Sequence, residues 1–376
     1  MLNQLSPHHI NTITLWYLVQ HSLSSFYKIA HHFENLADAL QPKHIQLWQS
    51  LGIHKNHIER LKQLHSTESQ KHLQQLLQHI QQDCDFIVTP TDQYYPTQLQ
   101  SFSDKPPILF GQGNIQALLQ PQIAIVGSRK ASPYGRQITH DFANYLSHKG
   151  FYITSGLAQG IDETAHYAAL KNHRTIAVMG TGLEQTYPNQ NIRLRHDILN
   201  HHGAVISEFL PLTKPLQHNF PRRNRIVSGL SLGVLVTEAS LNSGSLITAK
   251  LAAEQGLSVF AIPGHIYSEA QAGCHLLIRE GAILVDHPEQ IVEDLALPTQ
   301  WQQQNIDTSL PHQNHDIPEH LLPLYHQLDW VGQSMEQLIL QLKADIKVLT
   351  SDLVELELLG LCMQQSGLYL RCRSNE

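Results

Sequence analysis

Between residues 121 and 285 the chain repeats one pattern, which constrains its fold more than any other feature. Seven short apolar runs of strand length alternate with segments long enough to form helices. Because each run is continuously apolar, we expect both faces of the sheet to be buried, as in a parallel, doubly wound α/β sheet. The predicted strands are Ile123–Val126, Tyr152–Thr154, Ile176–Met179, Ala204–Ile206, Val234–Val236, Val259–Ile262 and Ile283–Val285.

Four glycines, Gly150, Gly203, Gly256 and Gly281, stand just before predicted strands. The end of a helix favours a residue that can adopt a positive φ, so we expect each of these glycines to terminate a helix. Ligands of such sheets bind outside the carboxyl ends of the strands. Any site is therefore predicted in the loops that follow the strands.

The segments on either side of the sheet have other patterns. The N-terminal segment has leucine-spaced amphipathic stretches and few glycines, which predicts short helices, and it is followed by an extended, proline-containing stretch. A stretch rich in Pro, Gln, Asn and Asp predicts a linker before the C-terminal segment. The predicted division is a helical domain at 1–82, a sheet domain at 83–296, a linker at 297–317 and a C-terminal domain at 318–376.

The C-terminal segment predicts three helices and a hairpin. Leu321–Leu328 favours the first helix, and Ser334 with Gln337 forms a capping box for the second. A third helix ends at Gly360, and a turn at Ser366-Gly367 separates two short strands. Three helices followed by a two-stranded wing is the plan of a winged-helix domain.

The charge of the chain is unevenly distributed. The net charge is -7, yet residues 291–376 hold four Lys and Arg against twelve Asp and Glu, so the acidity belongs to the C-terminal end. The predicted third helix there carries Asp352, Glu355 and Glu357 with Lys347. This charge would repel phosphate, so we expect a protein-contact or regulatory role for the C-terminal domain.

Several classes of protein are disfavoured by composition. The start of the chain has no leader pattern, and no run of about 18 apolar residues occurs, so we expect a cytoplasmic protein without a membrane span. Four scattered cysteines fit a reducing compartment. The 26 histidines show no metal-ligand spacing, so no metal site is predicted.

The loop after the first predicted strand carries Gly127, Ser128, Arg129 and Lys130. A glycine lets an anion approach the backbone, a hydroxyl and the start of the next helix offer donors, and the two cations supply counter-charge. This predicts a phosphate cradle. The loop matches neither GxxxxGK[ST] nor GxGxxG, and the second strand lacks a terminal acid, so we expect no nucleotide cofactor.

Two further loops offer similar chemistry. Ser155 and Gly156 follow the second strand, with Asp162 placed to cap the next helix; a tight turn with an N-cap is the alternative. Gly244, Ser245 and Lys250 lie before the sixth strand. Three such loops on one sheet edge suit several phosphates in a row better than one small ligand.

The densest cationic cluster lies between the fourth and fifth strands and consists of Arg222, Arg223 and Arg225. It is predicted to bind a nucleic-acid backbone, and a solvated basic face is the alternative. The neighbouring Phe220 could stack on a base or belong to the core.

The ordered motifs of this region resemble the DprA/Smf family of DNA-processing proteins. The resemblance covers residues 85–296 strongly, and the flanking domains resemble the N-terminal SAM-like and C-terminal domains of that family around its Rossmann-like core. It is carried by Ile125–Arg129, Ser155–Asp162 with Ala165-His166, Tyr187-Pro188, Ser207-Glu208, Phe220–Ile226, Ser243–Ala249 and Pro263-Gly264.

The resemblance implies a protein that binds single-stranded DNA without sequence preference, protects it and helps load the RecA recombinase in natural transformation. Members are not known for a catalysed reaction, so no catalytic residue is expected. The family's DNA-contacting Gly-Ser-Arg falls on Gly127, Ser128 and Arg129, while Gln159 replaces an arginine often found in the second loop.

The resemblance also implies a homodimer formed through the C-terminal side of the Rossmann-like domain. The apolar residues Leu276, Leu277 and Ile278 are the predicted interface, and packing against the sheet is the alternative.

A competing enzymatic hypothesis is a nucleoside-monophosphate phosphoribohydrolase resembling the LOG family, which carries a PGGxGTxxE segment. In this chain Glu238 precedes the glycine loop instead of following it.

Overall fold

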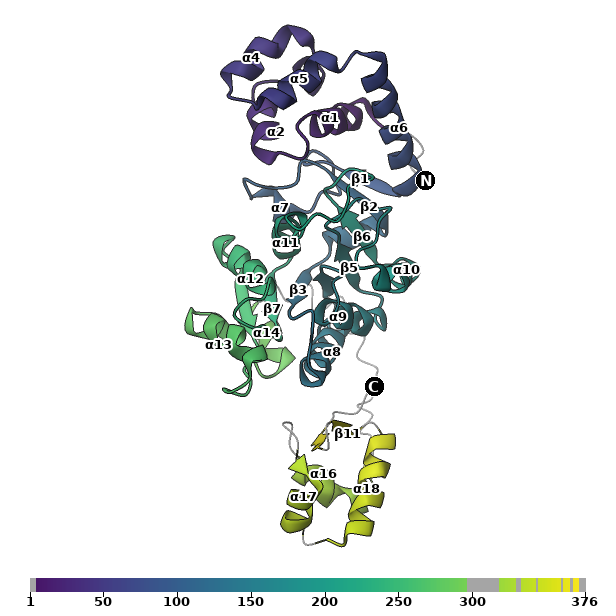
Figure 1. Ribbon diagram of the computed structural model, residues 1–376, viewed down its shortest axis with the longest axis vertical. Helices are drawn as coiled ribbons and strands as arrows, with labels where there is room; N and C mark the ends of the chain where they lie inside the picture. Colours follow the sequence, from purple (N-terminus) through teal and green to yellow (C-terminus); the bar gives the residue numbers. More distant parts are fainter. Residues whose placement is uncertain are drawn as a thin grey trace. The chain divides into compact units, whose positions relative to one another are not determined.

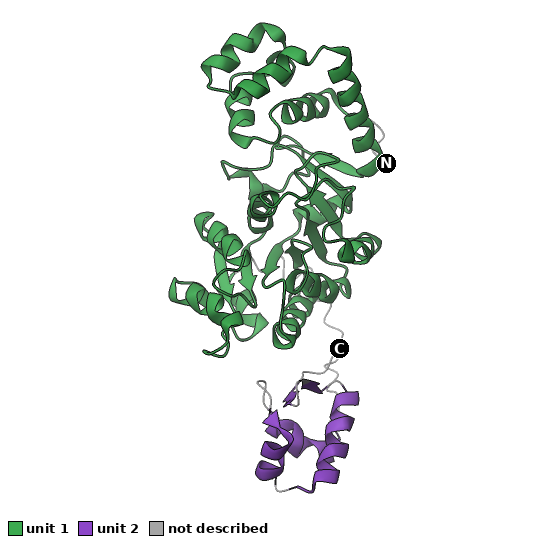
Figure 2. Ribbon diagram, in the orientation of Figure 1, with its two compact units in different colours: residues 1–305 green, residues 306–376 purple. Residues whose placement is uncertain are grey.

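The computed structural model describes residues 5–295, 318–328, 333–342, 344–359, 361–365 and 368–371. The chain divides into two compact units, residues 1–305 and 306–376 (Figure 2). The predicted linker at 297–317 lies outside the described residues. No described helix is both long enough and apolar enough to cross a membrane.

The first unit is built on a sheet that contains all seven predicted strands, and they are mutually parallel (Figure 1). The prediction of a doubly wound parallel sheet is confirmed. The strand order is β1-β2-β6-β5-β4-β3-β7-β8-β9, so the winding direction reverses between β3 and β7. The parallel strands are β3 (Gln122–Val126), β4 (Tyr152–Ser155), β5 (Thr175–Val178), β6 (Ala204–Ser207), β7 (Gly233–Val236), β8 (Ser258–Ala261) and β9 (Ile283–Leu284).

Two strands that the sequence pattern did not pair extend the sheet. β1 (Phe86–Val88) pairs antiparallel with β2 (Leu109–Gly113), and β2 pairs antiparallel with β6, with Phe110 opposite Ser207. The sequence predicted an extended segment here, but it could not predict the pairing of β2 with β6, because β6 is almost 100 residues further along the chain.

Helices cover both faces of the sheet. α8, α9 and α14 share one apolar cluster with Ile123 and Ile125, whereas α11, α12 and α13 pack with Ala124 and Val126 on the opposite face. Alternate residues of one strand thus serve opposite faces. The helices are α8 (Pro133–His148), α9 (Ile161–Leu170), α10 (Ile192–Asn200), α11 (Asn219–Gly229), α12 (Ser245–Glu254), α13 (Ala272–Arg279) and α14 (Pro288–Asp294).

Three of the four predicted terminating glycines have a positive φ: Gly150 at 104°, Gly256 at 72° and Gly281 at 105°. The prediction for Gly203 is wrong, because the preceding His202 takes the left-handed conformation at φ 60°. Gly203 is needed for space, since a Cβ there would lie 2.6 Å from the carbonyl oxygen of Thr175.

The N-terminal segment is helical, as expected, and serine N-caps begin three of its helices at Ser6, Ser22 and Ser66. Its apolar side chains form one cluster with sheet residues such as Ala177 and Val205. The predicted boundary at residue 82 is therefore a change from helices to strands within one compact unit. The helices are α1 (Pro7–Leu18), α2 (Leu23–Ala30), α3 (Leu36–Ala39), α4 (Ile45–Ser50), α5 (Lys55–Gln63) and α6 (Thr67–Asp83).

The second unit contains the three predicted helices and both hairpin strands, and a short strand joins them in one antiparallel sheet ordered β10-β12-β11. The predicted capping box is present: Gln337 N donates to Ser334 Oγ at 3.3 Å, and Ser334 N donates to Gln337 Oε1 at 2.8 Å. Gly360 and the turn at Ser366-Gly367 lie outside the described residues, and the winged-helix assignment stays a prediction. The elements are α16 (Leu322–Gln327), β10 (Gln333–Ser334), α17 (Met335–Leu342), α18 (Ile346–Leu358), β11 (Cys362–Gln365) and β12 (Leu368–Arg371).

Candidate functional site

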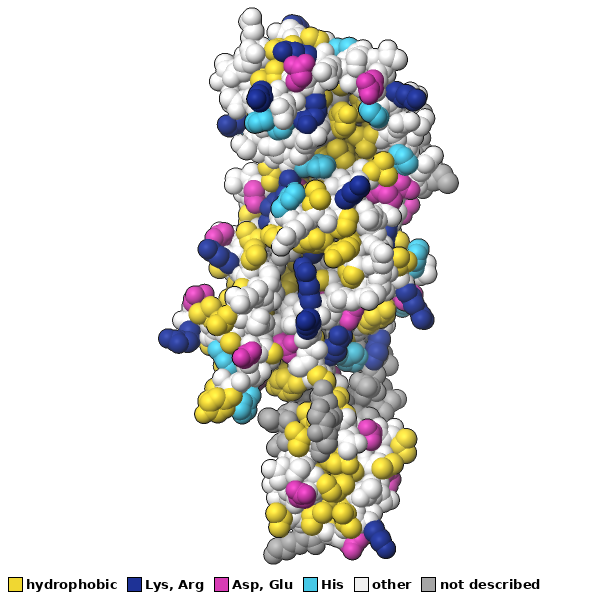
Figure 3. Space-filling model, in the orientation of Figure 1, with side chains coloured by type: hydrophobic (Ala, Val, Ile, Leu, Met, Phe, Trp, Pro, Cys, Tyr) yellow, Lys and Arg dark blue, Asp and Glu magenta, His cyan; other side chains and the backbone are white. Residues whose placement is uncertain are grey.

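A pocket of about 570 Å³ lies at the carboxyl ends of β3 and β7, where the winding direction of the sheet reverses. This is the place where open α/β sheets bind ligands. Lys and Arg side chains gather over the region of β3 in the space-filling view (Figure 3). Eight of the predicted site residues line the pocket: Gly127, Ser128, Arg129, Lys130, Gly156, Arg223, Gly244 and Ser245.

The loop after β3 presents two exposed cations on a fixed backbone. Ser128 N donates to the Glu238 carbonyl oxygen at 2.8 Å, and Ile161 N donates to the Ser128 carbonyl oxygen at 3.1 Å. Gly127 is required here, because a Cβ would lie 2.5 Å from Ile161 Cγ1. Arg129 and Lys130 are both exposed at the pocket. The loop can therefore offer two positive charges to an anion without reorganising.

The start of α8, predicted to face an anion, has partners within the protein instead. Ser132 caps this helix by accepting from Gly135 N at 3.0 Å, and Ser132 N donates to the Glu238 carboxylate at 3.1 and 3.2 Å. Ser132 Oγ also donates to Glu238 Oε2. The buried carboxylate thus occupies the position next to the helix terminus where a phosphate was expected.

The loop after β4 is held by hydrogen bonds to a buried carboxylate. Asp162 was predicted to cap α9, but Gly160 is the N-cap of this helix. The Asp162 carboxylate instead accepts from Gly156 N at 3.1 Å and Ala158 N at 3.3 Å. Burial raises the pKa of Asp162, and the nearby Arg223 opposes that shift. Ser155 is fully buried and donates to the Ile125 carbonyl oxygen at 2.7 Å, so it does not line the pocket.

The loop before α12 is open to the pocket. Gly244 is the N-cap of this helix, and a Cβ added there would meet no atom within 4 Å. The first-turn N–H groups have partners within the protein: Ser245 N donates to Ser243 Oγ at 3.4 Å, and Leu246 N donates to the Ser243 carbonyl oxygen at 3.2 Å. Lys250 is exposed further along α12 and does not line the pocket.

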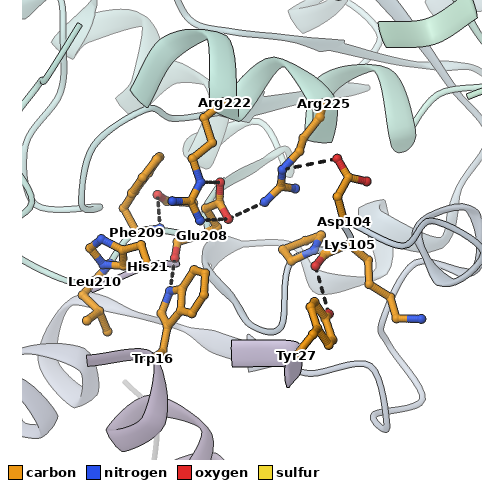
Figure 4. Close-up of polar contacts among 12 residues, drawn as sticks. Trp16, His21, Tyr27, Asp104, Lys105, Glu208, Phe209, Leu210, Arg222 and Arg225 are labelled. Carbon is orange, nitrogen blue, oxygen red and sulfur yellow. Dashed lines mark hydrogen bonds and ion pairs between the residues drawn. The ribbon is translucent and has the colours of Figure 1, made fainter. Parts of the chain in front are cut away.

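The arginine cluster is mostly engaged within the protein (Figure 4). Arg222 Nε and Nη2 donate to the two carboxylate oxygens of Glu208 at 3.0 and 3.1 Å, and Arg225 Nη2 donates to Glu208 Oε2 at 2.5 Å. Neither arginine lines the pocket. The prediction that both reach a phosphate does not fit this arrangement, since both guanidinium groups donate to the fully buried Glu208.

Arg223 lines the pocket, yet its guanidinium group is hydrogen-bonded within the protein. It donates to the Gly156 carbonyl oxygen at 2.5 Å and also to the Val178 carbonyl oxygen, joining the ends of β4 and β5. Burial lowers its pKa to about 10, so it remains charged at neutral pH. Burial and the charge of Arg223 lower the pKa of His166 to about 3, which keeps that histidine neutral.

One aromatic ring lies beside Arg129, and a second packs against the first. Phe220 is half-buried and lines the pocket, and the Arg129 guanidinium carbon is 5.8 Å from the centre of its ring. Tyr187, which sequence reasoning did not single out as a site residue, is 47% exposed, with its ring centre 5.3 Å from that of Phe220. The position of Tyr187, over 30 residues before Phe220, gave no local signal of this pairing.

The predicted dimer residues do not form one exposed patch. Leu277 is buried in the cluster beneath the sheet, which is the alternative left open by the sequence, while Ile278 is half-buried and Leu276 is 37% exposed. Only Leu276 and Ile278 of this set can meet a second copy.

Among the described residues no group of three His, Cys, Asp or Glu side chains could hold a metal ion.

Comparison with known proteins links this geometry to a family. Residues 86–296 match the model of DNA recombination-mediator protein A. Protein Smf of Escherichia coli (strain K12) is 40% identical over 316 residues, covering 81% of this chain and 82% of that protein. DNA processing protein DprA of Streptococcus pneumoniae is 47% identical over 204 residues, covering 54% of this chain and 72% of that protein.

Two solved structures resemble the chain at the level of the fold. The X-ray structure of DprA from S. pneumoniae superimposes with a TM-score of 0.67 at 34% identity, covering 78% of this chain and all of that one. The structure of DNA processing protein A from Helicobacter pylori, described for its single-stranded DNA binding mode, gives a TM-score of 0.51 at 29% identity, covering 56% of this chain and 95% of that one.

Proposed function

Because the chain belongs to the DNA recombination-mediator protein A family, we propose that the pocket between β3 and β7 binds single-stranded DNA without sequence preference. The observation that carries the proposal is that exposed Arg129 and Lys130 line one pocket with Phe220, whose ring contacts Tyr187. Cations follow a phosphate backbone, and aromatic rings accept any unpaired base, so the combination suits a strand rather than a sequence.

The chemistry of the pocket favours a single strand over a duplex. Paired bases stack on one another and do not offer a free face to Phe220 or Tyr187. Gly244, which begins α12 without a side chain, leaves open space on the wall of the same pocket. A strand crossing the pocket would thus meet both cations and aromatic faces.

Salt titrations with matched single-stranded and duplex oligonucleotides test this proposal on the intact chain. We expect tighter binding to the single strand, with the logarithm of the affinity falling linearly with the logarithm of the salt concentration. Equal or tighter binding to the duplex would contradict it.

The enzymatic alternative has little support from the site. Glu238, the residue that would correspond to the acid of a phosphoribohydrolase, is fully buried, is held by Ser132 and does not line the pocket. Incubation with AMP should release no adenine. Release of adenine at a rate proportional to the protein concentration would support the enzyme instead.

The cellular role that fits this binding is protection of incoming DNA and loading of RecA during natural transformation. The relatives are named for DNA processing, and a strand held through its backbone and base faces keeps its base-pairing edges available to a recombinase. The chain should accelerate RecA assembly on single strands coated with single-strand-binding protein. An unchanged assembly rate would count against the loading role.

We further propose that two copies associate through the surface around Leu276 and Ile278, which are apolar and only partly covered within the chain. Light scattering should give twice the 42.5 kDa chain mass for the parent protein. Ile278→Glu should give the mass of a single chain with unchanged circular dichroism. A dimer of normal stability in that variant would place the interface elsewhere.

The second unit is proposed to contact protein rather than DNA. Helix α18 carries Asp352, Glu355 and Glu357, and the Arg371 guanidinium carbon is 4.0 Å from the centre of the Tyr325 ring. A chain ending at residue 298 should therefore bind single strands within about threefold of the full chain at moderate salt. Loss of binding by a folded, dimeric truncation would show that the second unit reads DNA.

A further inference from the structure

The N-terminal helices contact the loop after β6 through Trp16 and His21 (Figure 4). Trp16 is fully buried, and its Nε1 donates to the Glu208 carbonyl oxygen at 2.8 Å. Leu210 N donates to His21 Nε2 at 3.2 Å, and burial together with the charge of Arg222 lowers the pKa of His21 to about 3. The indole of Trp16 thus holds the backbone of the residue whose carboxylate binds the arginines of α11.

The same tryptophan holds Arg222 directly. The Arg222 guanidinium carbon lies 5.4 Å from the ring centre of Trp16 and 5.4 Å from that of Phe209. Two rings and the bidentate carboxylate of Glu208 therefore surround one guanidinium that is only 24% exposed. Cation–π contacts are strongest where the cation is desolvated, so this arrangement fixes the side chain of Arg222.

Helix α11 connects these contacts to the pocket. Arg222 and Arg225 project from one side of α11 toward Glu208, whereas Phe220, Asn224 and Val227 line the pocket from the other side, at the spacing of one helical face. A rotation or shift of α11 would move both sides together. The helix is therefore the mechanical link between the N-terminal helices and the aromatic wall of the pocket.

A second contact leads from the N-terminal cluster to the pocket. Leu157, in the loop after β4, is fully buried in the cluster that contains Trp16, and it adopts φ 57°. Its neighbours Gly156 and Ala158 line the pocket. The N-terminal helices thus pack against two segments that line the pocket, α11 and the loop after β4.

We propose that Trp16 is a positioning residue for DNA binding: it fixes α11 through Arg222 and Glu208 and thereby sets the place of Phe220 without touching the strand. This inference rests on the proposed function of the pocket. It assigns the N-terminal helices a role in the affinity of a site to which they contribute no lining residue.

The test compares Trp16→Leu with Trp48→Leu in the intact chain, using fluorescent oligo(dT) as the probe. Trp48 is also fully buried in the N-terminal cluster but bonds to no group in the described part of the chain through its Nε1, so it controls for loss of a large side chain. Trp16→Leu should raise the Kd about five- to tenfold. Trp48→Leu should bind within about twofold of the parent.

The salt dependence distinguishes positioning from a phosphate contact. Trp16→Leu should keep the parent slope, because no phosphate contact is removed, and Trp16→Phe, which retains a ring beside Arg222, should restore most of the affinity. If Trp16→Leu does not fold, Trp16→Met carries the test, because it too lacks a ring beside Arg222 and a donor to Glu208, and its Kd should rise by the same five- to tenfold. A folded Trp16→Leu or Trp16→Met variant with parent affinity, or equal losses in Trp16→Leu and Trp48→Leu, overturns the proposal.

Arg129→Ala in the same titration separates this inference from the function on which it rests. If Arg129→Ala binds like the parent, the pocket is not the DNA site and the proposed function fails. If Arg129→Ala weakens binding while Trp16→Leu does not, only the positioning role fails.

Discussion

Glu208→Ala is expected to lower the free energy of unfolding of the first unit by about 3–5 kcal/mol. The Glu208 side chain is fully buried and binds Arg222 and Arg225, whose side chains are 24% and 7% exposed. Its removal leaves two largely desolvated cations, and within the described part of the chain only Arg225 keeps another carboxylate, that of Asp104 at 3.8 Å. The cost therefore exceeds that of an exposed ion pair, which is about 1 kcal/mol or less.

Urea denaturation followed by circular dichroism measures this loss. Glu280→Ala is the matched control, because Glu280 is exposed, and its effect should stay within about 0.5 kcal/mol. A loss below about 1 kcal/mol in Glu208→Ala would mean that water replaces the carboxylate and that the cluster is less buried than described.

Arg129→Glu combined with Lys130→Glu is expected to weaken single-stranded DNA binding on the order of 100-fold at low salt, with the fold retained. Both side chains are exposed at the pocket, so the change reverses charge without disturbing the core. Two lost phosphate contacts should also flatten the salt slope by about 1.4, at about 0.7 for each contact with a single strand.

The control for this variant makes the same change in net charge away from the pocket. Arg193 on α10 and Lys55 on α5 are exposed, so Arg193→Glu with Lys55→Glu should leave the slope unchanged and reduce affinity only slightly. Equal losses in the two double variants would attribute binding to overall charge instead of to the pocket.

Strands and loops of this fold could be predicted because their signals are local. Apolar runs marked the seven parallel strands, and Ser334 with Gln337 marked a helix start that the structure confirms. The loops containing Gly127, Gly156 and Gly244 follow from the rule that parallel strands end at one edge, and they do meet in one pocket.

Partners distant in sequence could not be predicted. A count of positive charge treats Arg222 and Arg225 as free, whereas their carboxylate, Glu208, lies in another loop and becomes their partner only when β6 and α11 pack together. Glu238 likewise closes the start of α8 from over 100 residues away. Ion pairing and burial of this kind decide which cations remain available to a ligand.

The local sequence also misplaced residues whose roles depend on packing. Asp162 has the sequence position of a capping residue, yet α9 begins after Gly160, which has a positive φ. The Asp162 carboxylate therefore accepts hydrogen bonds from N–H groups of the preceding loop. Leu277 belongs to an apolar triplet, but the turn of α13 directs it to the core while Leu276 faces outward. Periodicity along a single helix turn is too short a signal to separate these outcomes.

The central claim is that the pocket between β3 and β7 binds single-stranded DNA. Photochemical crosslinking tests it most directly: a single strand containing 5-iodouracil is crosslinked to the intact chain, and mass spectrometry identifies the crosslinked residues. A base stacked in the pocket must lie against Phe220 or the adjacent ring of Tyr187. Crosslinks at Phe220 or Tyr187 that disappear in Arg129→Glu with Lys130→Glu are the predicted result. Crosslinks confined to the second unit or to the N-terminal helices would contradict the assignment of the pocket as the DNA-binding site.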